Sequence, residues 1–323
     1  MKHLMLDTNG LIIKKRNNCF FVISKKTKRI ISPLKIQSII VSADILMSSS
    51  AFNLAVKHQI PVYYTDKTGN VFAKIYSSHF VAEAELRQKQ VFWSLSNEAR
   101  QWVLDIVKIK LNNQRSLMKA KKIKINDDSN DRKLEDININ DPDFFKNIRI
   151  IEARHSKEYW NHYRSLLPQD TIMYSRSQRP AQDSVNMFLN YFYGFLYSLM
   201  EQALWSNGLS PYIAVMHDYQ YNKPILSFDL IEAFRVIVDD FVLEIILNKK
   251  ITAGMYKKTS KSMYISKQGK KALIPVFLEK MEQQVKFDGY RTTWINHIYR
   301  FAYKMKQSVK TQKILKDEIF NML

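Results

Sequence analysis

Several features that would place a chain in a particular class are missing from this one. Cys19 is the only cysteine among 323 residues, so no intramolecular disulfide can form and a reducing, intracellular compartment is expected. The residues after Met1 are too polar for a secretory signal, because no sustained apolar stretch follows. No segment has the roughly 18 uncharged apolar residues that a membrane-spanning helix requires. We therefore expect a soluble cytoplasmic protein with no membrane partner.

Acidic residues are scarce relative to basic ones. The chain has 30 Asp and Glu against 50 Lys and Arg, which gives a formal net charge of +20. Such an excess favours a polyanionic partner, although simple solubility or nonspecific adhesion would also account for it. The charge is interleaved with Tyr, Trp and Phe, and this mixture lets cations contact phosphates while aromatic rings stack on bases. We therefore favour nucleic acid as the partner.

The order of periodic patterns predicts an α+β fold. Short β-prone runs such as 19–23, 39–41 and 60–65 alternate with turn signals in the first 75 or so residues, with one helix over 48–58. From about residue 82 the apolar residues recur with helical spacing. The predicted helices lie near 81–93, 97–120, 143–165, 182–206, 228–248, 270–285 and 290–321.

These patterns predict two domains. Residues 1–78 are expected to form a small N-terminal β-strand domain, residues 79–90 a linker and first helix, and residues 91–323 a larger all-α catalytic domain. A polar stretch at 249–271 carries eight lysines between two helical segments. Its interspersed Met and Tyr residues favour an ordered loop over a free tail.

Glu152 and His217 each lie beside strongly apolar residues. A glutamate on or beside the core is costly unless it is paired or bound to a cation. A salt bridge between Glu152 and Arg149, which is three residues earlier, is the alternative explanation. His217 ends a short apolar segment, and a histidine in such a place, taken on its own, is more often structural than a ligand.

Asp229 and Glu232 are three residues apart, so both carboxylates project from neighbouring positions of one predicted helix. Asp229 is also explained by a first helical turn capped by Ser227, where a carboxylate favours the helix dipole. Glu232 is explained less well in this way, because it lies deeper among apolar neighbours. Oxygen and nitrogen ligands of these types suit a hard or borderline divalent cation, which predicts a metal-dependent enzyme acting on nucleic acid.

A second arrangement competes for the metal. Glu152, His155, Glu158 and His162 form a Glu-x-x-His pattern with a second His one heptad later. Helical metal proteins use Glu-x-x-His, usually as two copies on different helices. No convincing second copy is present in this sequence.

Several motifs occur in a fixed order along the chain. Residues 176–186 contain Arg-Pro followed by Asp-x-x-Asn, residues 208–217 run from Gly-Leu-x-Pro to His217, and residues 226–235 contain Leu-x-x-Asp-Leu-x-Glu. Earlier and later segments are Lys-x-x-Asn-Gln at 110–114, a glutamate followed by a Tyr-Trp pair at 152–160, and a Gly-Lys turn within 264–272. Together these motifs resemble those of the CRISPR-associated integrases, the Cas1 family, in which the glutamate and the histidine are metal ligands. Two departures are Ala153, where the family often has Gly, and Glu232, where some members carry Asp.

The resemblance implies a metal-dependent DNA integrase or endonuclease that inserts new spacer DNA into a CRISPR array by 3′-hydroxyl transesterification. Mn²⁺ or Mg²⁺ would be held by Glu152, His217 and Glu232, and Asp229 would orient His217 or a metal-bound water. The candidate DNA contacts are Arg176, Arg179, Lys257, Lys258, Lys261, Lys270 and Lys271.

The resemblance also implies an assembly. The family works as a homodimer, and two such dimers flank a dimer of the small Cas2 subunit in a heterohexamer that holds double-stranded prespacer DNA and acts on the CRISPR repeat. Two other functions stay open on the sequence alone. One is a metal-dependent DNA nuclease outside CRISPR, and the other is a non-catalytic, basic DNA-binding scaffold.

Overall fold

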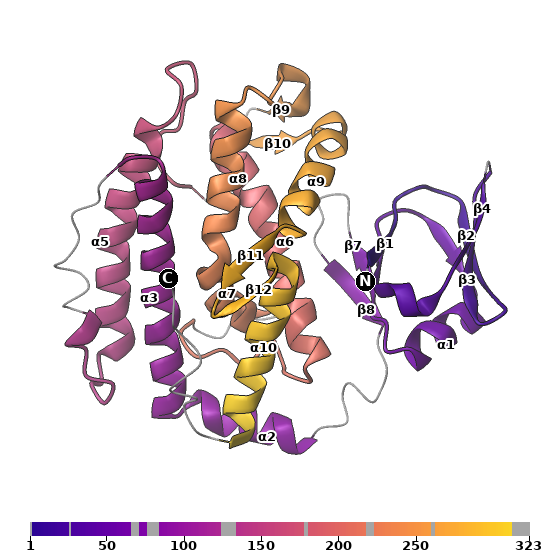
Figure 1. Cartoon of the computed structure of the whole chain (residues 1–323), viewed down its shortest axis with the longest axis horizontal. Coiled ribbons are helices and arrows are strands. Elements are labelled where there is room, and N and C mark those ends of the chain that lie inside the picture. The colour runs from indigo at the N-terminus through magenta and orange to yellow at the C-terminus, as the bar shows by residue number, and fades with distance from the viewer. Residues whose placement is uncertain are drawn as a thin grey trace. The chain divides into compact units, whose positions relative to one another are not determined.

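The structure is a computed structural model, and it describes residues 2–25, 27–65, 71–75, 84–123, 134–177, 180–217, 223–259 and 262–311. The fold is α+β, as predicted, with strands in the N-terminal part and helices dominating the remainder (Figure 1). Two compact units, Met1–Ala84 and Glu85–Leu323, divide the chain. Among the described helices, none is long and apolar enough to cross a membrane.

The described residues of the first unit form two four-stranded sheets. One has the order β1 (Lys2–Leu6), β5 (Ile36–Val41), β7 (Val62–Thr65) and β8 (Val71–Ile75). The other has the order β4 (Lys28–Ile31), β3 (Cys19–Ile23), β2 (Leu11–Arg16) and β6 (Ile45–Met47). The turn between β2 and β3 is made by Asn17 and Asn18, both at positive φ, which suits a tight hairpin.

Helix α1 (Ser49–Lys57) packs against the second sheet, at β2 and β3. It begins as predicted, because the side chain of Ser48 accepts a hydrogen bond from Ala51 N. The core of this unit includes Ile13, Phe20 and Ile39, which are fully buried. These residues come from the short apolar runs that alternate along the strands.

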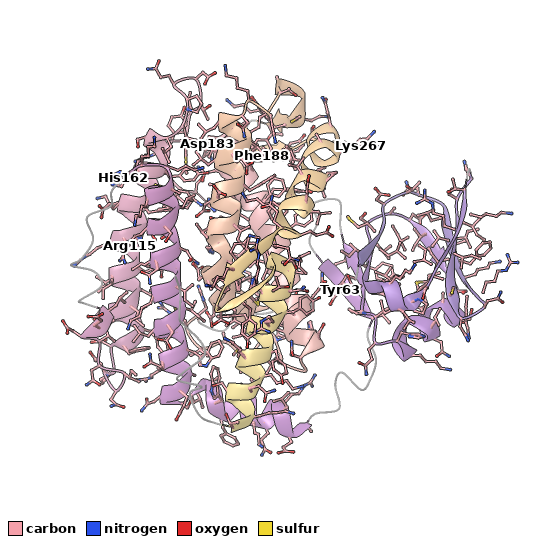
Figure 2. The ribbon with its side chains drawn as sticks, in the orientation of Figure 1. Tyr63, Arg115, His162, Asp183, Phe188 and Lys267 are labelled. Atoms are coloured by element: carbon pink, nitrogen blue, oxygen red, sulfur yellow. The ribbon has the colours of Figure 1, made fainter. Side chains whose placement is uncertain are left out.

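The second unit is a helical bundle. The α-helices that the structure describes there are α2 (Ala84–Ser94), α3 (Asn97–Ala120), α5 (Phe144–Ser165), α6 (Ser184–Ser206), α7 (Ile225–Ile231), α8 (Arg235–Leu247), α9 (Lys267–Met281) and α10 (Trp294–Thr311). Helix α6 contacts α7, α8 and α10, and α3 lies beside α5 (Figure 1). Asp183 caps α6 by accepting a hydrogen bond from Asn186 N, and Phe188 one turn later is fully buried; both are labelled in Figure 2.

The helix predicted at 228–248 is not continuous. It is divided into α7, a short 3-10 turn η3 (Glu232–Phe234), and α8. No Gly or Pro lies at this break, so local sequence gave no warning of it. The break matters because η3 contacts α3 and starts with one of the candidate ligands, Glu232.

Short hairpins interrupt the helices of this unit. Residues 290–293, predicted as the start of the helix at 290–321, instead form strand β12 (Tyr290–Thr293), which pairs with β11 (Gln284–Phe287), and α10 begins only at Trp294. The turn of this hairpin is Asp288-Gly289, with both residues at positive φ, as a tight hairpin turn requires. The described parts of the lysine-rich stretch, residues 249–259 and 262–271, include a hairpin of β9 (Tyr256–Lys258) and β10 (Met263–Ile265).

Candidate active site

Two of the three candidate ligands meet at a lysine. Glu152 lies on α5 and Glu232 begins η3, and both elements contact α3. The ammonium of Lys110, on α3, forms an ion pair with Glu152 Oε1 and lies 2.6 Å from Glu232 Oε2. The two carboxylates are 80 positions apart in the sequence, and the fold brings both to the same cation.

Glu232 is a buried carboxylate between two cations. Its side chain is 6% exposed, and Arg235 Nε lies 2.7 Å from Oε1. Burial alone would raise the pKa of Glu232, but the charges of Arg235 and Lys110 outweigh it and lower the pKa below its usual value. The carboxylate is therefore ionised at neutral pH. Its Oε2 has Lys110 at ion-pair distance but no well-aligned hydrogen-bond donor.

Lys110 is the positive counterpart of this arrangement. Its side chain is 8% exposed. Burial would lower the pKa of Lys110, but the charges of Glu232 and Glu152 outweigh it, so the pKa is raised and the ammonium stays charged. Asn113, one turn later on α3, donates a hydrogen bond of 2.9 Å to Ala233 O and ties η3 to this helix.

Asp229 fixes the position of His217. The backbone N–H groups of Val215 and Met216 donate to Asp229 Oδ2 at 2.9 and 3.1 Å, and His217 Nδ1 contacts Oδ1 of the same buried carboxylate. Arg149 also holds this segment by donating to Met216 O at 2.6 Å. With Nδ1 committed to Asp229, Nε2 is the nitrogen left to bind a ligand.

Electrostatics connects His217 to the carboxylate pair. The hydrogen bond to Asp229 is the largest cause that raises the pKa of His217, burial opposes it, and the negative charge of Glu232 adds to the rise. His217 in turn contributes to lowering the pKa of Glu232. The imidazole is therefore within electrostatic reach of the carboxylate, although the three groups come from α5, η3 and the segment before α7.

The donor set fits a divalent cation in its chemistry. Two carboxylates and an imidazole are hard and borderline ligands, and Oε2 of Glu232 is a buried acceptor without an aligned donor. Within the described residues, however, His, Cys, Asp and Glu side chains do not form a ready three-ligand cluster. In this arrangement the ammonium of Lys110 stands between the carboxylates.

The structure decides among the alternative explanations of these residues. Arg149 binds the carbonyl of Met216, and Glu152 pairs with Lys110, so the alternative of an Arg149–Glu152 salt bridge is not realised. Ser227 does not cap a helix, because α7 begins at Ile225 and Ser227 is fully buried inside it. Asp229 accordingly lies beyond the first turn, and the helix-dipole explanation does not apply.

The Glu-x-x-His pattern on α5 does not gather around one centre. His155 is fully buried. His162, labelled in Figure 2, lies 3.8 Å from Glu158, and both side chains are about a third exposed. Glu152 instead contacts Lys110 on α3. The members of the pattern therefore lie in separate environments.

Arg176, a predicted DNA contact, has an internal role. Its guanidinium donates to Asn186 Oδ1 at 2.9 Å and Asn190 Oδ1 at 2.7 Å, and it lies over the rings of Trp160 and Tyr193. This position ties the segment before α6 to α5 and α6. The guanidinium therefore has partners inside the protein, and its predicted phosphate contact stays a prediction.

The predicted lysine contacts that the structure describes lie on β9 and α9. Lys257, Lys258 and Lys271 are exposed, and Lys270 is half-buried with its ammonium 5.4 Å from the centre of the Tyr191 ring. The other two predicted contacts, Arg179 and Lys261, lie outside the described residues.

A tyrosine network surrounds the buried Asp239 on α8. Tyr159 donates to Asp239 Oδ2 at 2.8 Å, Tyr193 contacts Oδ1, and Tyr163 donates to the backbone carbonyl of Asp239 at 2.9 Å. Burial raises the pKa of Asp239 to about 6, although the hydrogen bonds from Tyr193 and Tyr159 to its carboxylate oppose the rise. Arg235 lies 4.8 Å from the centre of the Tyr193 ring, so this network supports the cation beside Glu232.

Lys110, Asn113 and Arg235 were not predicted as site residues. Lys110 entered the prediction only as part of a family signature. The available signal was that Lys110 and Gln114 occupy the apolar, buried face of an amphipathic helix, where a charge needs a partner. The partners themselves are distant in sequence, so they could not be named.

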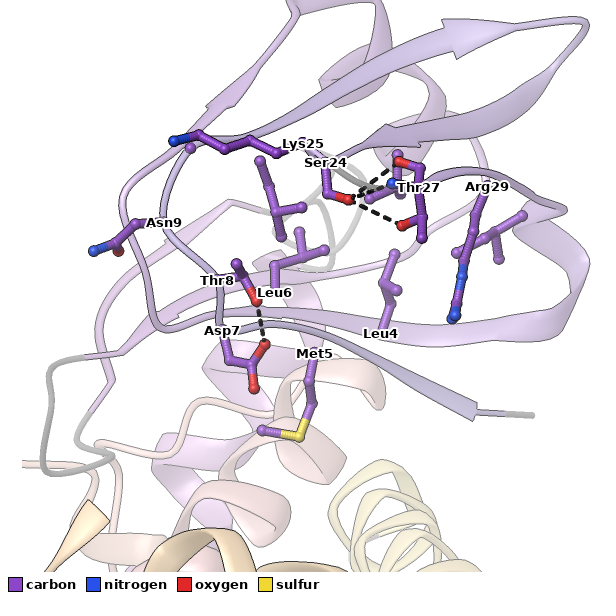
Figure 3. A pocket seen from close by; sticks show the side chains of 14 residues that line it. Leu4, Met5, Leu6, Asp7, Thr8, Asn9, Ser24, Lys25, Thr27 and Arg29 are labelled. Carbon is purple, nitrogen blue, oxygen red and sulfur yellow. Dashed lines mark hydrogen bonds between the residues drawn. The ribbon is translucent and has the colours of Figure 1, made fainter. Parts of the chain in front are cut away.

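A hollow of about 420 Å³ in the first unit is a separate feature (Figure 3). Its lining combines apolar side chains such as Leu6 and Val22 with polar ones such as Asp7 and Arg29. None of the predicted site residues lines it, and it carries no cluster of ligand or nucleophile side chains.

Comparison with known proteins gives consistent matches along the chain. Residues 4–279 match the sequence profile described as CRISPR associated protein Cas1. The CRISPR-associated endonuclease Cas1 1 of Thermodesulfovibrio yellowstonii is 28% identical over 319 residues, covering 94% of this chain and 97% of the relative.

Two solved structures share the fold. A casposase bound to integration product superposes with a TM-score of 0.80 at 20% identity, covering 100% of this chain and 96% of the casposase. The chain of a partial Cas6-RT-Cas1–Cas2 complex superposes with a TM-score of 0.71 at 19% identity, covering 100% of this chain and 99% of the other. At identities this low, the structural matches establish a shared fold.

Proposed function

The chain belongs to the CRISPR-associated protein Cas1 family, and from this premise we propose that it is a divalent-metal-dependent DNA integrase that inserts spacer DNA into a CRISPR array. A curated relative along nearly the full length is a CRISPR-associated endonuclease, and the casposase of the same fold is bound to an integration product. The observation that carries the proposal is the meeting of Glu152 and Glu232, from distant elements, at the ammonium of Lys110, with His217 within electrostatic reach of Glu232.

We propose Glu152, His217 and Glu232 as the ligands of Mn²⁺ or Mg²⁺. Bound there, such an ion supplies Lewis-acid polarisation of the scissile phosphodiester and stabilises charge on its oxygens. The residues around the ligands prepare them for this role. Asp229 orients the imidazole through Nδ1, and Arg235 keeps Glu232 ionised.

The reaction proposed is transesterification by a DNA 3′-hydroxyl. The hydroxyl attacks a phosphodiester of the repeat, a new phosphodiester forms, and the displaced strand leaves with its own 3′-hydroxyl. No water is consumed in this step, which distinguishes it from hydrolysis by the same centre. Water in place of the hydroxyl gives nuclease activity, the second function that the site chemistry supports.

The DNA contact surface that we propose consists of Lys257 and Lys258 on β9 together with Lys270 and Lys271 on α9. The hairpin is anchored, because Met263 N donates to Ala181 O at 3.0 Å and Tyr256 meets the Phe188 ring on α6. Its lysines are therefore presented from a fixed surface. Arg179 and Lys261 remain predictions outside the described residues.

For the assembly we propose a homodimer, and two such dimers with a Cas2 dimer, acting on prespacer and repeat DNA in the cytoplasm. The support is that a chain with the same fold occurs in a partial Cas6-RT-Cas1–Cas2 complex. The net charge of +20 suits a DNA partner.

A strand-transfer assay tests the proposed function. The purified protein, with its Cas2 partner, is given a double-stranded donor with free 3′-hydroxyl ends, a plasmid carrying one repeat, and Mn²⁺. Joined products support the integrase, shortened strands alone support a nuclease, and bound but unchanged DNA supports a scaffold.

Site variants make the assay specific. Glu152→Gln and His217→Ala are expected to abolish joining while DNA binding is kept, because neither residue lies on the lysine surface. Glu244→Gln is the matched control, because Glu244 forms an ion pair of 3.0 Å with Lys280 in the same unit. The Glu244→Gln protein should join DNA normally. Wild-type joining by either site variant would refute the site assignment.

A further inference from the structure

The ammonium of Lys110 has the position that a metal ion would need. It contacts Oε1 of Glu152 and lies 2.6 Å from Oε2 of Glu232. Both carboxylates are largely withdrawn from water, with 21% and 6% of their side chains exposed. A pair of like charges in such surroundings repels strongly unless a cation lies between them. Lys110 supplies that cation.

A divalent cation and the ammonium cannot both occupy this space. Each needs the same carboxylate oxygens, and two cations in a poorly solvated site repel each other. Either the metal binds outside the pair, or the ammonium leaves when the metal enters.

Lys110 is the partner that can leave. Among the described residues, the contacts of its ammonium are the two carboxylates themselves. Arg235, the other cation at Glu232, is held in addition by a 2.7 Å hydrogen bond to Tyr197 Oη and by the Tyr193 ring. The backbone of α3 is fixed by the bond from Asn113 to Ala233, so movement falls to the four rotatable bonds of the lysine side chain.

We propose that Lys110 is a resident cation that competes with the metal. It holds Glu152 and Glu232 together in the metal-free protein, and a divalent ion binds by displacing its ammonium from between them. The inference rests on the proposed function in one respect, that these carboxylates are metal ligands. It makes Lys110 a positioning residue that preserves the site when no metal is bound and limits the affinity for metal.

The first test measures Mn²⁺ affinity of the full-length protein. Free Mn²⁺ is followed by electron paramagnetic resonance during titration of wild type, Lys110→Met and Lys280→Met. Lys110→Met is expected to bind Mn²⁺ about tenfold more tightly, because the competing cation is gone. Equal or weaker binding by Lys110→Met overturns the proposal.

Lys280 is the matched control. Its side chain is 13% exposed and its ammonium bridges two carboxylates, Asp240 at 2.6 Å and Glu244 at 3.0 Å, away from the candidate ligands. Lys280→Met is expected to lower the melting temperature and leave Mn²⁺ affinity unchanged. Without metal, Lys110→Met should have a lower melting temperature than wild type, and added Mn²⁺ should raise its melting temperature by more. If Lys110 were merely structural, Mn²⁺ would raise the melting temperatures of wild type and Lys110→Met equally.

A second measurement needs no variant. The wild-type protein is acetylated briefly with an amine-reactive ester, with and without Mn²⁺, and the modified peptides are quantified by mass spectrometry. Release of the ammonium is expected to raise the modification rate of Lys110 severalfold and leave that of Lys280 unchanged. An unchanged rate at Lys110 overturns the proposal even if Lys110→Met fails to fold.

Failure of this inference is distinguishable from failure of the proposed function. Glu152→Gln and Glu232→Gln are titrated with Mn²⁺ alongside the lysine variants. If both lose binding while Lys110→Met shows no gain, the metal site stands and the role of Lys110 is wrong. If both bind Mn²⁺ as wild type does, the metal lies elsewhere, and both proposals are overturned.

Discussion

Replacing Asp229 with Asn tests how the site prepares its histidine. The substitution keeps the shape of the side chain but turns one carboxylate oxygen into an N–H donor. Oδ2 accepts from two backbone N–H groups and Oδ1 faces His217 Nδ1, so the amide cannot satisfy both sides as the carboxylate does. Leaving the two backbone donors unpaired would cost about 1–3 kcal/mol each.

The amide is therefore expected to keep its oxygen toward the backbone and its nitrogen toward His217. Nδ1 must then accept a hydrogen bond, which places the imidazole proton on Nε2, the nitrogen that should bind the metal. The expected loss of metal affinity is about 10–100-fold. Stability should fall by about 2 kcal/mol, since a charge-assisted acceptor becomes a neutral one.

The pH dependence of this loss has a definite sign. The hydrogen bond to Asp229 is the main cause that raises the pKa of His217 above 6.5 in the folded protein. A raised histidine pKa contributes stability that is fully present below the unfolded value and disappears as pH rises through the folded value. Asp229→Asn should therefore cost more stability below pH 6.5 than at alkaline pH.

Mn²⁺ titration followed by electron paramagnetic resonance gives the metal affinity. Urea unfolding at one pH below 6.5 and at one alkaline pH gives the change in stability. Asp240→Asn is the control, because Asp240 pairs with Lys280 and Lys121 and does not contact His217. Wild-type metal affinity in Asp229→Asn would refute the orienting role of this carboxylate.

Three further predictions concern other parts of the chain. The carboxyl group of buried Asp239 has a pKa of about 6, against 3.8 in the unfolded chain, so the folded state binds its proton more tightly. The free energy of unfolding should therefore fall by about 3 kcal/mol as pH rises from about 4 to 6. Asp239→Asn should flatten this pH profile in urea unfolding, and an unchanged slope would show that other groups cause it. Asn186→Ala removes hydrogen bonds to Arg176, Ser177 N and Ser175 O, and should lower the free energy of unfolding by about 2–3 kcal/mol. A loss within experimental error would show that these hydrogen bonds do not stabilise the fold. Lys257→Ala should reduce the slope of log affinity against log salt by about 0.9 if it contacts one phosphate, and an unchanged slope in a filter-binding series would remove it from the DNA surface.

Much of the fold could be predicted where a local signal and tertiary packing agree. Helices α1 and α3 begin within a residue or two of their predicted starts, because Ser48 and Ser96 cap them and apolar periodicity follows. The break between α7 and α8 could not be predicted. It lacks Gly and Pro, and it is stabilised by contacts with α3, including Asn113 to Ala233 O, that lie more than a hundred residues away in sequence.

The residue types of the candidate site could be proposed from the sequence, but the contacts between those residues could not. Glu152, His217 and Glu232 were singled out because charged or titratable groups on apolar segments need partners. The partner Lys110 depends on how α3, α5 and η3 pack, which no local pattern encodes. The contacts of Arg176 were likewise not predictable, because its guanidinium binds Asn186 and Asn190 on α6, and its predicted DNA contact stays a prediction.

Anomalous scattering from a crystal soaked in Mn²⁺ tests the central claim most directly. The account predicts a manganese peak at bonding distance from a carboxylate oxygen of Glu152, Nε2 of His217 and a carboxylate oxygen of Glu232. It also predicts that the ammonium of Lys110 has moved out from between the two glutamates. A peak coordinated by other side chains, or a peak that excludes any one of the three, would contradict the account.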